Sequence, residues 1–146
     1  WRETRGNIKA VMIALIQSKH AWGAQRNKYK TPRDFVFSMM RLIEPKRRKT
    51  KSIVYALKQL GQSPFMAGSP AGYPDEEKAW LGASALTNRI DIAAAFAGRY
   101  KINAEQSMAI SLGATVSELT YKSVVRAESR KHATTLFLLS PEFQRR

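Results

Sequence analysis

The sequence predicts an all-α fold, and three observations support this prediction. Apolar residues recur at the three- and four-residue spacing of a helix along most of the chain. No long stretch alternates between apolar and polar residues, and no hairpin dipeptide separates two apolar runs. Helix-start residues such as Ser, Thr and Asn stand between the apolar stripes. We therefore expect one domain over residues 1–146, an irregular bundle of about seven helices with one long loop rich in proline, glycine and aromatic residues.

Two helices are predicted in the first third of the chain. The first carries an apolar face over residues 8–19, with Thr4 as its expected N-cap and an end at residues 22–23. The second begins at residues 31–32, because Thr accepts hydrogen bonds from first-turn amides and Pro suits the first helical position. Pro45 is expected to end it.

A long irregular segment follows the third predicted helix. That helix is expected to end at Leu60, with Gly61 in a left-handed cap. Residues 62–74 contain three prolines and two glycines and are predicted to form a loop. Asp75 is expected to cap a short helix with two glutamates in its first turn.

The last third of the chain is predicted to be helical to its end. One helix is expected from Ser84 to Gly98 and another after the cap residue Asn103, while residues 117–139 form one or two more, divided between residues 132 and 133. The segment from Ser140 to Glu142 combines a cap, a first-turn proline and an acidic residue. We expect it to start a helical turn that closes the core, with Phe143 folded back toward the preceding leucines.

The composition excludes several kinds of site. A chain of 146 residues buries enough surface to fold without a metal or a disulfide. It has no cysteine, which excludes disulfides, thiolate metal sites and cysteine nucleophiles. No apolar run approaches the roughly 20 residues of a membrane span. His20 and His132 lie far apart in the sequence, and no metal-ligand, P-loop or nucleophile-elbow motif occurs. We therefore expect no metal, no cofactor and no catalytic residue within these 146 residues.

The positive charge is concentrated near the start of the chain. The net charge is +14, and residues 1–51 hold 14 basic and 3 acidic side chains, a net of +11. The densest run is a candidate anion-binding cluster made of Lys46, Arg47, Arg48, Lys49 and Lys51. It would bind phosphates or another polyanion with an affinity that falls as salt rises. The alternative is a solvated loop between two helices that binds nothing.

The long loop is a second candidate site. We consider Phe65, Tyr73, Asp75 and Trp80, with Arg89 on the helix that follows, as residues that contact a partner or ligand. The alternative is a rigid clasp over the core. Arg89 is expected to pair with Asp75 or to donate to loop carbonyls, and a structural role is favoured over substrate binding.

Four blocks occur in an order typical of one bacterial family. They are YKTPRDFVFSMMR (29–41), LGQSPFMAGSPAGYPDEEKAWL (60–81), NRIDIAAAFA (88–97) and SPEFQRR (140–146). The chain thus resembles the C-terminal third of the family catalogued as domain of unknown function 1800. Tyr73 stands where that pattern usually has Trp, and DEEKA replaces a short glycine-containing turn. The resemblance implies a largely helical, exported protein with no established reaction, of which this chain is a C-terminal piece.

Three functional hypotheses follow. The first is a non-catalytic helical domain of an exported protein that acts in envelope or extracellular assembly, bound to its own N-terminal remainder or to a protein partner. The second is a polyanion- or nucleic-acid-binding module that uses the cluster at residues 46–51. The third is part of an enzyme whose catalytic groups lie upstream.

Overall fold

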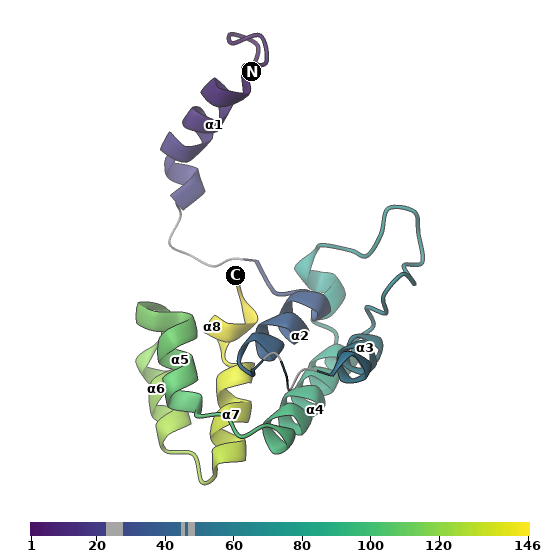
Figure 1. Ribbon diagram of the computed structural model, residues 1–146, viewed down its shortest axis with the longest axis vertical. Coiled ribbons are helices and arrows are strands. Elements are labelled where there is room, and N and C mark those ends of the chain that lie inside the picture. Colours follow the sequence, from purple (N-terminus) through teal and green to yellow (C-terminus); the bar gives the residue numbers. More distant parts are fainter. Residues whose placement is uncertain (23–27, 45, 47–48) are drawn as a thin grey trace.

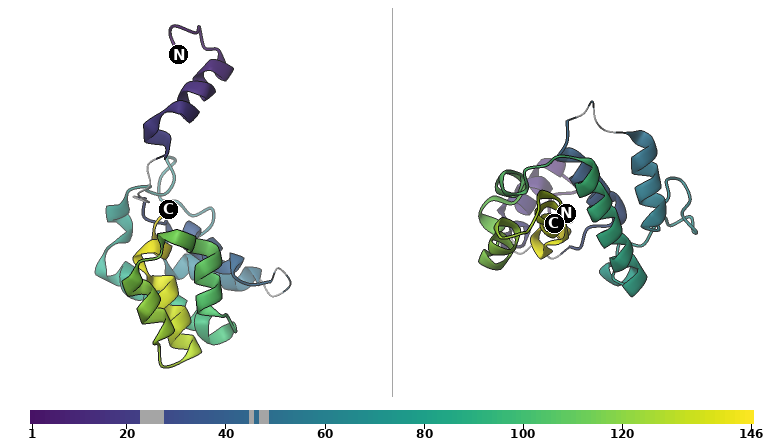
Figure 2. Two further views of the ribbon diagram at one scale, coloured as in Figure 1. Left: turned by 90° about the vertical axis from the view of Figure 1, so that its left-hand side faces the viewer. Right: turned by 90° about the horizontal axis from the view of Figure 1, so that it is seen from below.

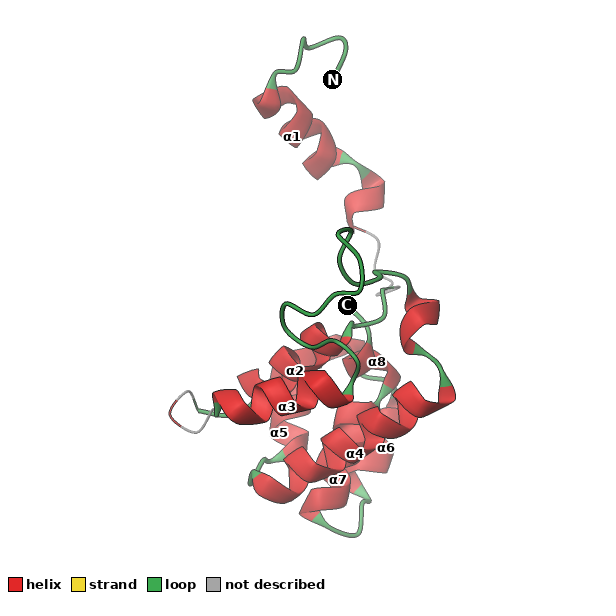
Figure 3. Ribbon diagram, turned by 90° about the vertical axis from the view of Figure 1, so that its right-hand side faces the viewer, coloured by secondary structure: helices red, strands yellow, loops and turns green. Residues whose placement is uncertain are grey.

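The computed structural model describes residues 1–22, 28–44, 46 and 49–146. Its described part contains helices and no strand, which confirms the all-α prediction (Figure 3). The helices are α1 (Ile8–Gln17), α2 (Pro32–Arg41), α3 (Thr50–Gln59), α4 (Ala83–Arg99), α5 (Ala104–Leu112), α6 (Glu118–Val125), α7 (Arg130–Leu139) and α8 (Pro141–Gln144). Within the described residues, no helix combines the length and the apolar character needed to cross a membrane.

Helices α2 to α8 form the body of the molecule, and α1 stands apart from it (Figure 1). Helices α4 and α7 pack together at the centre of the body. Helices α5 and α6 cover one side of α7, and α2 with α3 lies on the other side (Figures 1 and 2). The short helix α8 returns the C-terminus to the start of α2. Figure 1, the left view of Figure 2 and Figure 3 all show α1 projecting away from the body.

Most of the predicted helix caps are present. The Thr31 hydroxyl accepts a hydrogen bond from the backbone N–H of Asp34 at 3.3 Å, and Pro32 is the first residue of α2. Gly61 follows α3 with φ of +80°, a conformation that an L side chain rarely adopts. Asn103 caps α5 and Ser140 caps α8 through their side chains. Local sequence signals are therefore sufficient to place these helix ends.

Several predicted boundaries are wrong. Helix α1 is capped by Asn7 rather than Thr4, because the Asn7 side chain accepts from the N–H of Ala10. Helix α4 begins at Ala83 and runs through Gly98 to Arg99, where packing on α7 continues the helix past the glycine.

The break in the last third also lies elsewhere than predicted. It falls between α6 and α7, at residues 126–129, and Ser129 caps the second of these helices. The predicted stop at Pro45 lies outside the described residues, and α2 ends before it.

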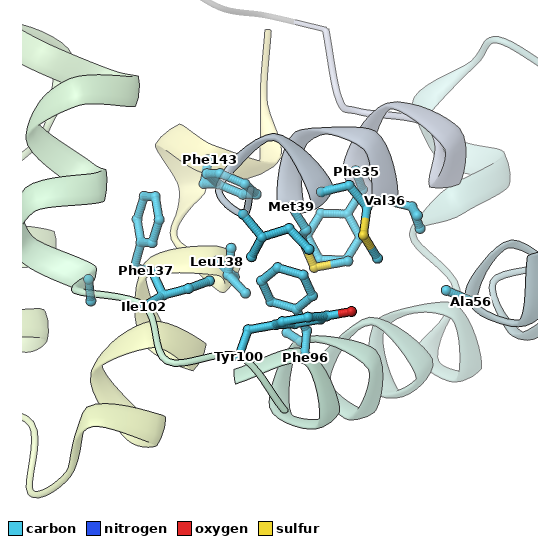
Figure 4. Packing of buried hydrophobic residues seen from close by; sticks show 14 of the residues in the cluster. Phe35, Val36, Met39, Ala56, Phe96, Tyr100, Ile102, Phe137, Leu138 and Phe143 are labelled. Atoms are coloured by element: carbon cyan, nitrogen blue, oxygen red, sulfur yellow. The ribbon is translucent and has the colours of Figure 1, made fainter. Parts of the chain in front are cut away.

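The core lies between α2, α4 and α7 and is rich in aromatic rings. Phe143 of α8 packs edge-on against Phe137 of α7, with ring centroids 4.9 Å apart, and against Phe35 of α2 at 6.2 Å. Phe96 of α4 and Tyr100, the residue that follows this helix, form a third ring contact, at 4.9 Å (Figure 4). The predicted closure of the core by the C-terminal turn is therefore present, and the rings that receive Phe143 come from two other helices.

Candidate functional site

Arg89 is a buried cation at the meeting point of three chain segments. It lies on α4 and is only 2% exposed. Its Nη2 donates to the carbonyl oxygen of Lys30 at 2.6 Å, and its Nη1 donates to Oε1 of Gln144 at 2.7 Å. The guanidinium also lies over the rings of Tyr29 and Phe35, with centroid distances of 4.4 and 5.1 Å. One side chain thus joins α4, the entry to α2 and the C-terminal segment.

The charge of Arg89 is stabilised by neutral groups. Among the described residues no carboxylate forms an ion pair with it. Burial lowers the pKa of Arg89, and burial also raises the pKa of Tyr29 even though the nearby Arg89 charge opposes that increase. A carbonyl, an amide oxygen and two ring faces therefore replace the water that the guanidinium loses.

Backbone hydrogen bonds reinforce the same junction. Residues 28–30 run antiparallel to residues 144–146, and Tyr29 and Arg145 form an isolated β-bridge. The N–H of Lys30 donates to the carbonyl oxygen of Gln144 at 2.8 Å, and the N–H of Arg146 donates to that of Lys28 at 2.9 Å. The C-terminal segment is therefore held by main chain and side chain together.

Ion pairs surround this junction at the surface. Arg145 pairs with Glu77 at 2.6 Å, and Arg146 pairs with Asp34 at 3.2 Å. Each pair links the C-terminal segment to another part of the chain, which fixes its position more than it adds stability.

Two predictions for Asp75, as a helix cap and as the partner of Arg89, are wrong. Asp75 pairs with Lys28, and the hydrogen bond from Lys28 lowers the pKa of the Asp75 carboxyl. It therefore neither caps the following turn nor pairs with Arg89. That turn is a 3₁₀ helix over Glu77–Trp80, and Glu76 occupies its cap position.

Three of the four sequence blocks of the family resemblance meet at Arg89, and the second block is bonded to the first. The first block supplies Tyr29 and Lys30, the third supplies Arg89 and the fourth supplies Gln144. The second block joins them through Gln62, whose Oε1 accepts from the backbone N–H of Arg33 at 2.7 Å. Because these groups bond to one another, the blocks act together to support the fold.

The long loop is held at its base and open along its length. The Tyr73 hydroxyl donates to the carbonyl oxygen of Ser63 at 2.7 Å, and the indole N–H of Trp80 donates to that of Pro74 at 3.1 Å. The rings of Tyr73 and Trp80 are 6.5 Å apart. Phe65 is fully exposed, so the loop is not a clasp over the core along its whole length. Of the predicted loop residues, Tyr73 and Trp80 are in contact, whereas Phe65, Asp75 and Arg89 have separate surroundings.

The basic cluster is described only in part. Lys46, Lys49 and Lys51 are exposed, and no carboxylate of the described residues pairs with any of them. Arg47 and Arg48 lie outside the described residues. No group of His, Asp and Glu in the described chain is arranged to hold a metal ion.

Helix α1 presents an apolar surface that the predictions did not single out. Eight of its ten residues are apolar, and none is buried. Ile8 is 71% exposed, and the other large apolar residues exposed along the helix are Met12, Ile13, Leu15 and Ile16. The sequence indicates this helix but not that the body leaves it uncovered. An apolar helix of this kind is normally buried.

These features define a class of protein: an all-α domain fastened by a buried arginine, with one apolar helix outside the body. The chain belongs to the family described as "Protein of unknown function (DUF1800)", whose model matches residues 1–145. The match confirms the family resemblance and extends it over residues 1–28, which the four sequence blocks do not cover. No curated protein and no solved structure matches the chain.

Proposed function

We propose that this chain is a non-catalytic helical module of an exported bacterial protein, and that it acts in envelope or extracellular assembly by binding a protein partner through α1. The supporting observation is a helix with eight apolar residues in ten, none of which is buried. Burying a large aliphatic side chain is worth about 1.5–3 kcal/mol, so several such residues together provide a strong driving force for association.

The charges around α1 indicate the chemistry of the partner. Residues 1–22 carry Arg2, Arg5, Lys9 and Lys19, against the single carboxylate of Glu3. A protein groove with an apolar floor and an acidic rim complements this segment. A second copy of the same segment brings like charges together, which disfavours pairing of α1 with itself.

The test begins with identification of the partner and ends with a measured affinity. A photo-crosslinking amino acid at Ile16 in the native host, with one at the exposed Lys58 as a control, identifies the protein that contacts α1. The purified partner is then titrated with the full chain. We expect saturable binding. Leu15→Asp should weaken it at least about tenfold, because burying the new carboxylate in an apolar interface removes its hydration without providing a partner. Gln17→Asp is the matched control, since it adds the same charge to the same turn at a polar position.

Three outcomes contradict the proposal. The first is equal affinity of the parent chain and Leu15→Asp for the crosslinked protein. The second is sedimentation of the chain as a dimer that Leu15→Asp dissociates. The third is binding of α1 to anionic vesicles with no crosslinked protein.

Polyanion binding is a second candidate function, supported by the exposure of three lysines without carboxylate partners in the described chain. It predicts retention on heparin at about 150 mM salt. The double variant Lys49→Glu/Lys51→Glu should elute at clearly lower salt than a Lys58→Glu/Lys122→Glu control of equal net charge. Elution of both variants at the same salt contradicts a specific role for the cluster.

A further inference from the structure

A groove of about 380 Å³ lies between α2, α3 and α4, away from α1. Its lining is mainly apolar and includes Met39, Met40, Ala56, Ile92, Phe96 and Tyr100. Figure 4 shows Met39 facing the rings of Phe96 and Tyr100, with Ala56 on the α3 side. Its volume falls in the usual range of small-molecule sites, and such sites are lined by apolar and aromatic side chains with few polar groups.

Two cations that are far apart in the sequence both line this groove. Lys51 comes from the first turn of α3 and Arg99 from the last turn of α4, and both are exposed. Arg99 donates from Nη1 to the hydroxyl of Ser52 at 2.9 Å, and its guanidinium lies 5.7 Å from the ring of Tyr100.

Among the described residues, no carboxylate lines the groove or pairs with either of these two charges. The lining of the groove contains neither Asp nor Glu. Within the described chain, neither Lys51 nor Arg99 has a carboxylate partner. The groove therefore combines an apolar interior with a rim of positive charge.

We propose that this groove binds a single-chain aliphatic carboxylate. The alkyl chain lies along the accessible lining residues Tyr55, Ile92 and Ala95, and the carboxylate lies between Lys51 and Arg99. A neutral apolar ligand leaves both cations unused, and a fully polar anion leaves the apolar lining exposed. Helix α1 of another molecule is a poor occupant, because its own cations meet the cations of the rim. The proposal is independent of the partner-binding role of α1.

Calorimetric titration of the full chain with three probes tests this ligand class. Decanoate has the proposed head and tail, acetate has the head alone, and decyltrimethylammonium has the same tail with the opposite charge. We expect saturable binding of decanoate at one site, with the other two probes at least about tenfold weaker, the equivalent of one lost charge-assisted contact. Absence of decanoate binding, or equal binding of decanoate and decyltrimethylammonium, overturns the proposal.

Variants then locate the site. Lys51→Gln and Arg99→Gln should each weaken decanoate binding by about tenfold. Lys58→Gln, an exposed lysine on the same helix α3 that does not line the groove, should leave it unchanged. Ala95→Trp places a large ring in the groove and should abolish binding, with thermal unfolding used to verify that the variant is folded.

A charge reversal keeps the proposal testable if the tryptophan variant does not fold. Lys51→Glu/Arg99→Glu should lose decanoate and gain decyltrimethylammonium. Decanoate binding that none of the Lys51 and Arg99 variants alters overturns the assignment to this groove.

Discussion

At the scale of single residues, Arg89 is a buried side chain that joins three separate segments of the chain. It is buried, charged and surrounded by neutral acceptors and aromatic rings. The planar fork of a guanidinium reaches two acceptors at once and also stacks on a ring, whereas an ammonium is a compact point charge. The residue type is therefore as important here as the charge.

Arg89→Lys should lower the free energy of unfolding by about 2–3 kcal/mol. A lysine at this position leaves at least one of two buried acceptors, the Lys30 carbonyl and Gln144 Oε1, without its donor. Urea unfolding measures the change. Arg126→Lys, on an exposed arginine, is the control and should stay within about 0.5 kcal/mol of the parent. Equal stability of the two variants would contradict the role assigned to Arg89.

Glu142 makes the C-terminal turn sensitive to acid. Its carboxylate accepts from the N–H of Ser117 at 3.0 Å and from the hydroxyl of Thr120 at 2.9 Å, at the start of α6. Burial tends to raise the pKa of Glu142, but these hydrogen bonds outweigh it and the pKa is lower than usual. The folded-state pKa is thus below the unfolded one, so the stabilisation is present above the unfolded pKa and is lost as pH falls through the folded pKa.

Glu142→Gln should therefore reduce stability by about 1–2 kcal/mol at neutral pH, because a charge-assisted acceptor at a helix N-terminus is lost. The difference from the parent should shrink as the pH falls below about 4, where the parent carboxyl is protonated as well. Urea unfolding across this pH range measures it. Glu128→Gln, on an exposed glutamate, should show no such trend, and a difference for Glu142→Gln that is constant with pH would contradict the assignment.

At the scale of secondary-structure elements, α1 differs from the other seven helices. Its ten residues include none that is buried, whereas each of α2 to α8 contributes at least two buried residues. An isolated helix of this length is marginal in water, and its stability in proteins comes from packing. The body of the molecule therefore supplies none of the packing that stabilises the other helices.

Leu15→Asp should leave the unfolding free energy of the chain within about 0.5 kcal/mol of the parent, because the side chain is exposed and packs on no part of the body. Leu138→Ala, in the fully buried part of α7, is the contrast and should cost about 2–5 kcal/mol. Thermal or urea unfolding followed by circular dichroism measures both. A large loss for Leu15→Asp would mean that α1 packs on the body in solution.

At the scale of the whole molecule, the C-terminal segment closes the fold. Residues 140–146 supply Phe143 to the core, Gln144 to Arg89 and an antiparallel pairing to residues 28–30. The contacts with Arg89 and with residues 28–30 join residues more than 50 positions apart in the sequence, so they form only when the rest of the body is in place.

Removal of residues 140–146 should lower stability by about 5 kcal/mol or more and leave little native structure. The loss combines the burial of a Phe ring with the cost of a buried arginine that has lost a partner. Unfolding curves and amide hydrogen exchange measure the effect. The control is Arg146→Ala, which removes only an exposed ion pair and should cost about 0–1 kcal/mol. A truncated chain as stable as this control would contradict the closing role.

The candidate residues show which contacts can be predicted from local sequence patterns and which cannot. Asp75 pairs with Lys28, and Arg89 bonds to Lys30 and Gln144. These contacts join distant segments of the chain, and residue spacing in the sequence does not predict them. By contrast, Gly61, Asn103 and Ser140 act within four residues of their own position, and their roles were predictable. Arg89 was predicted to be structural, but its partners were not.

The sequence by itself determined the helical class, the long loop, most helix caps and the family, because these depend on local periodicity, cap chemistry and short motifs. Only the tertiary structure decided that three separate motifs meet at Arg89, that Lys51 and Arg99 line one groove, and that α1 remains uncovered. Hydrophobic burial and charge pairing act between whichever surfaces meet in space, and one sequence does not state which surfaces those are.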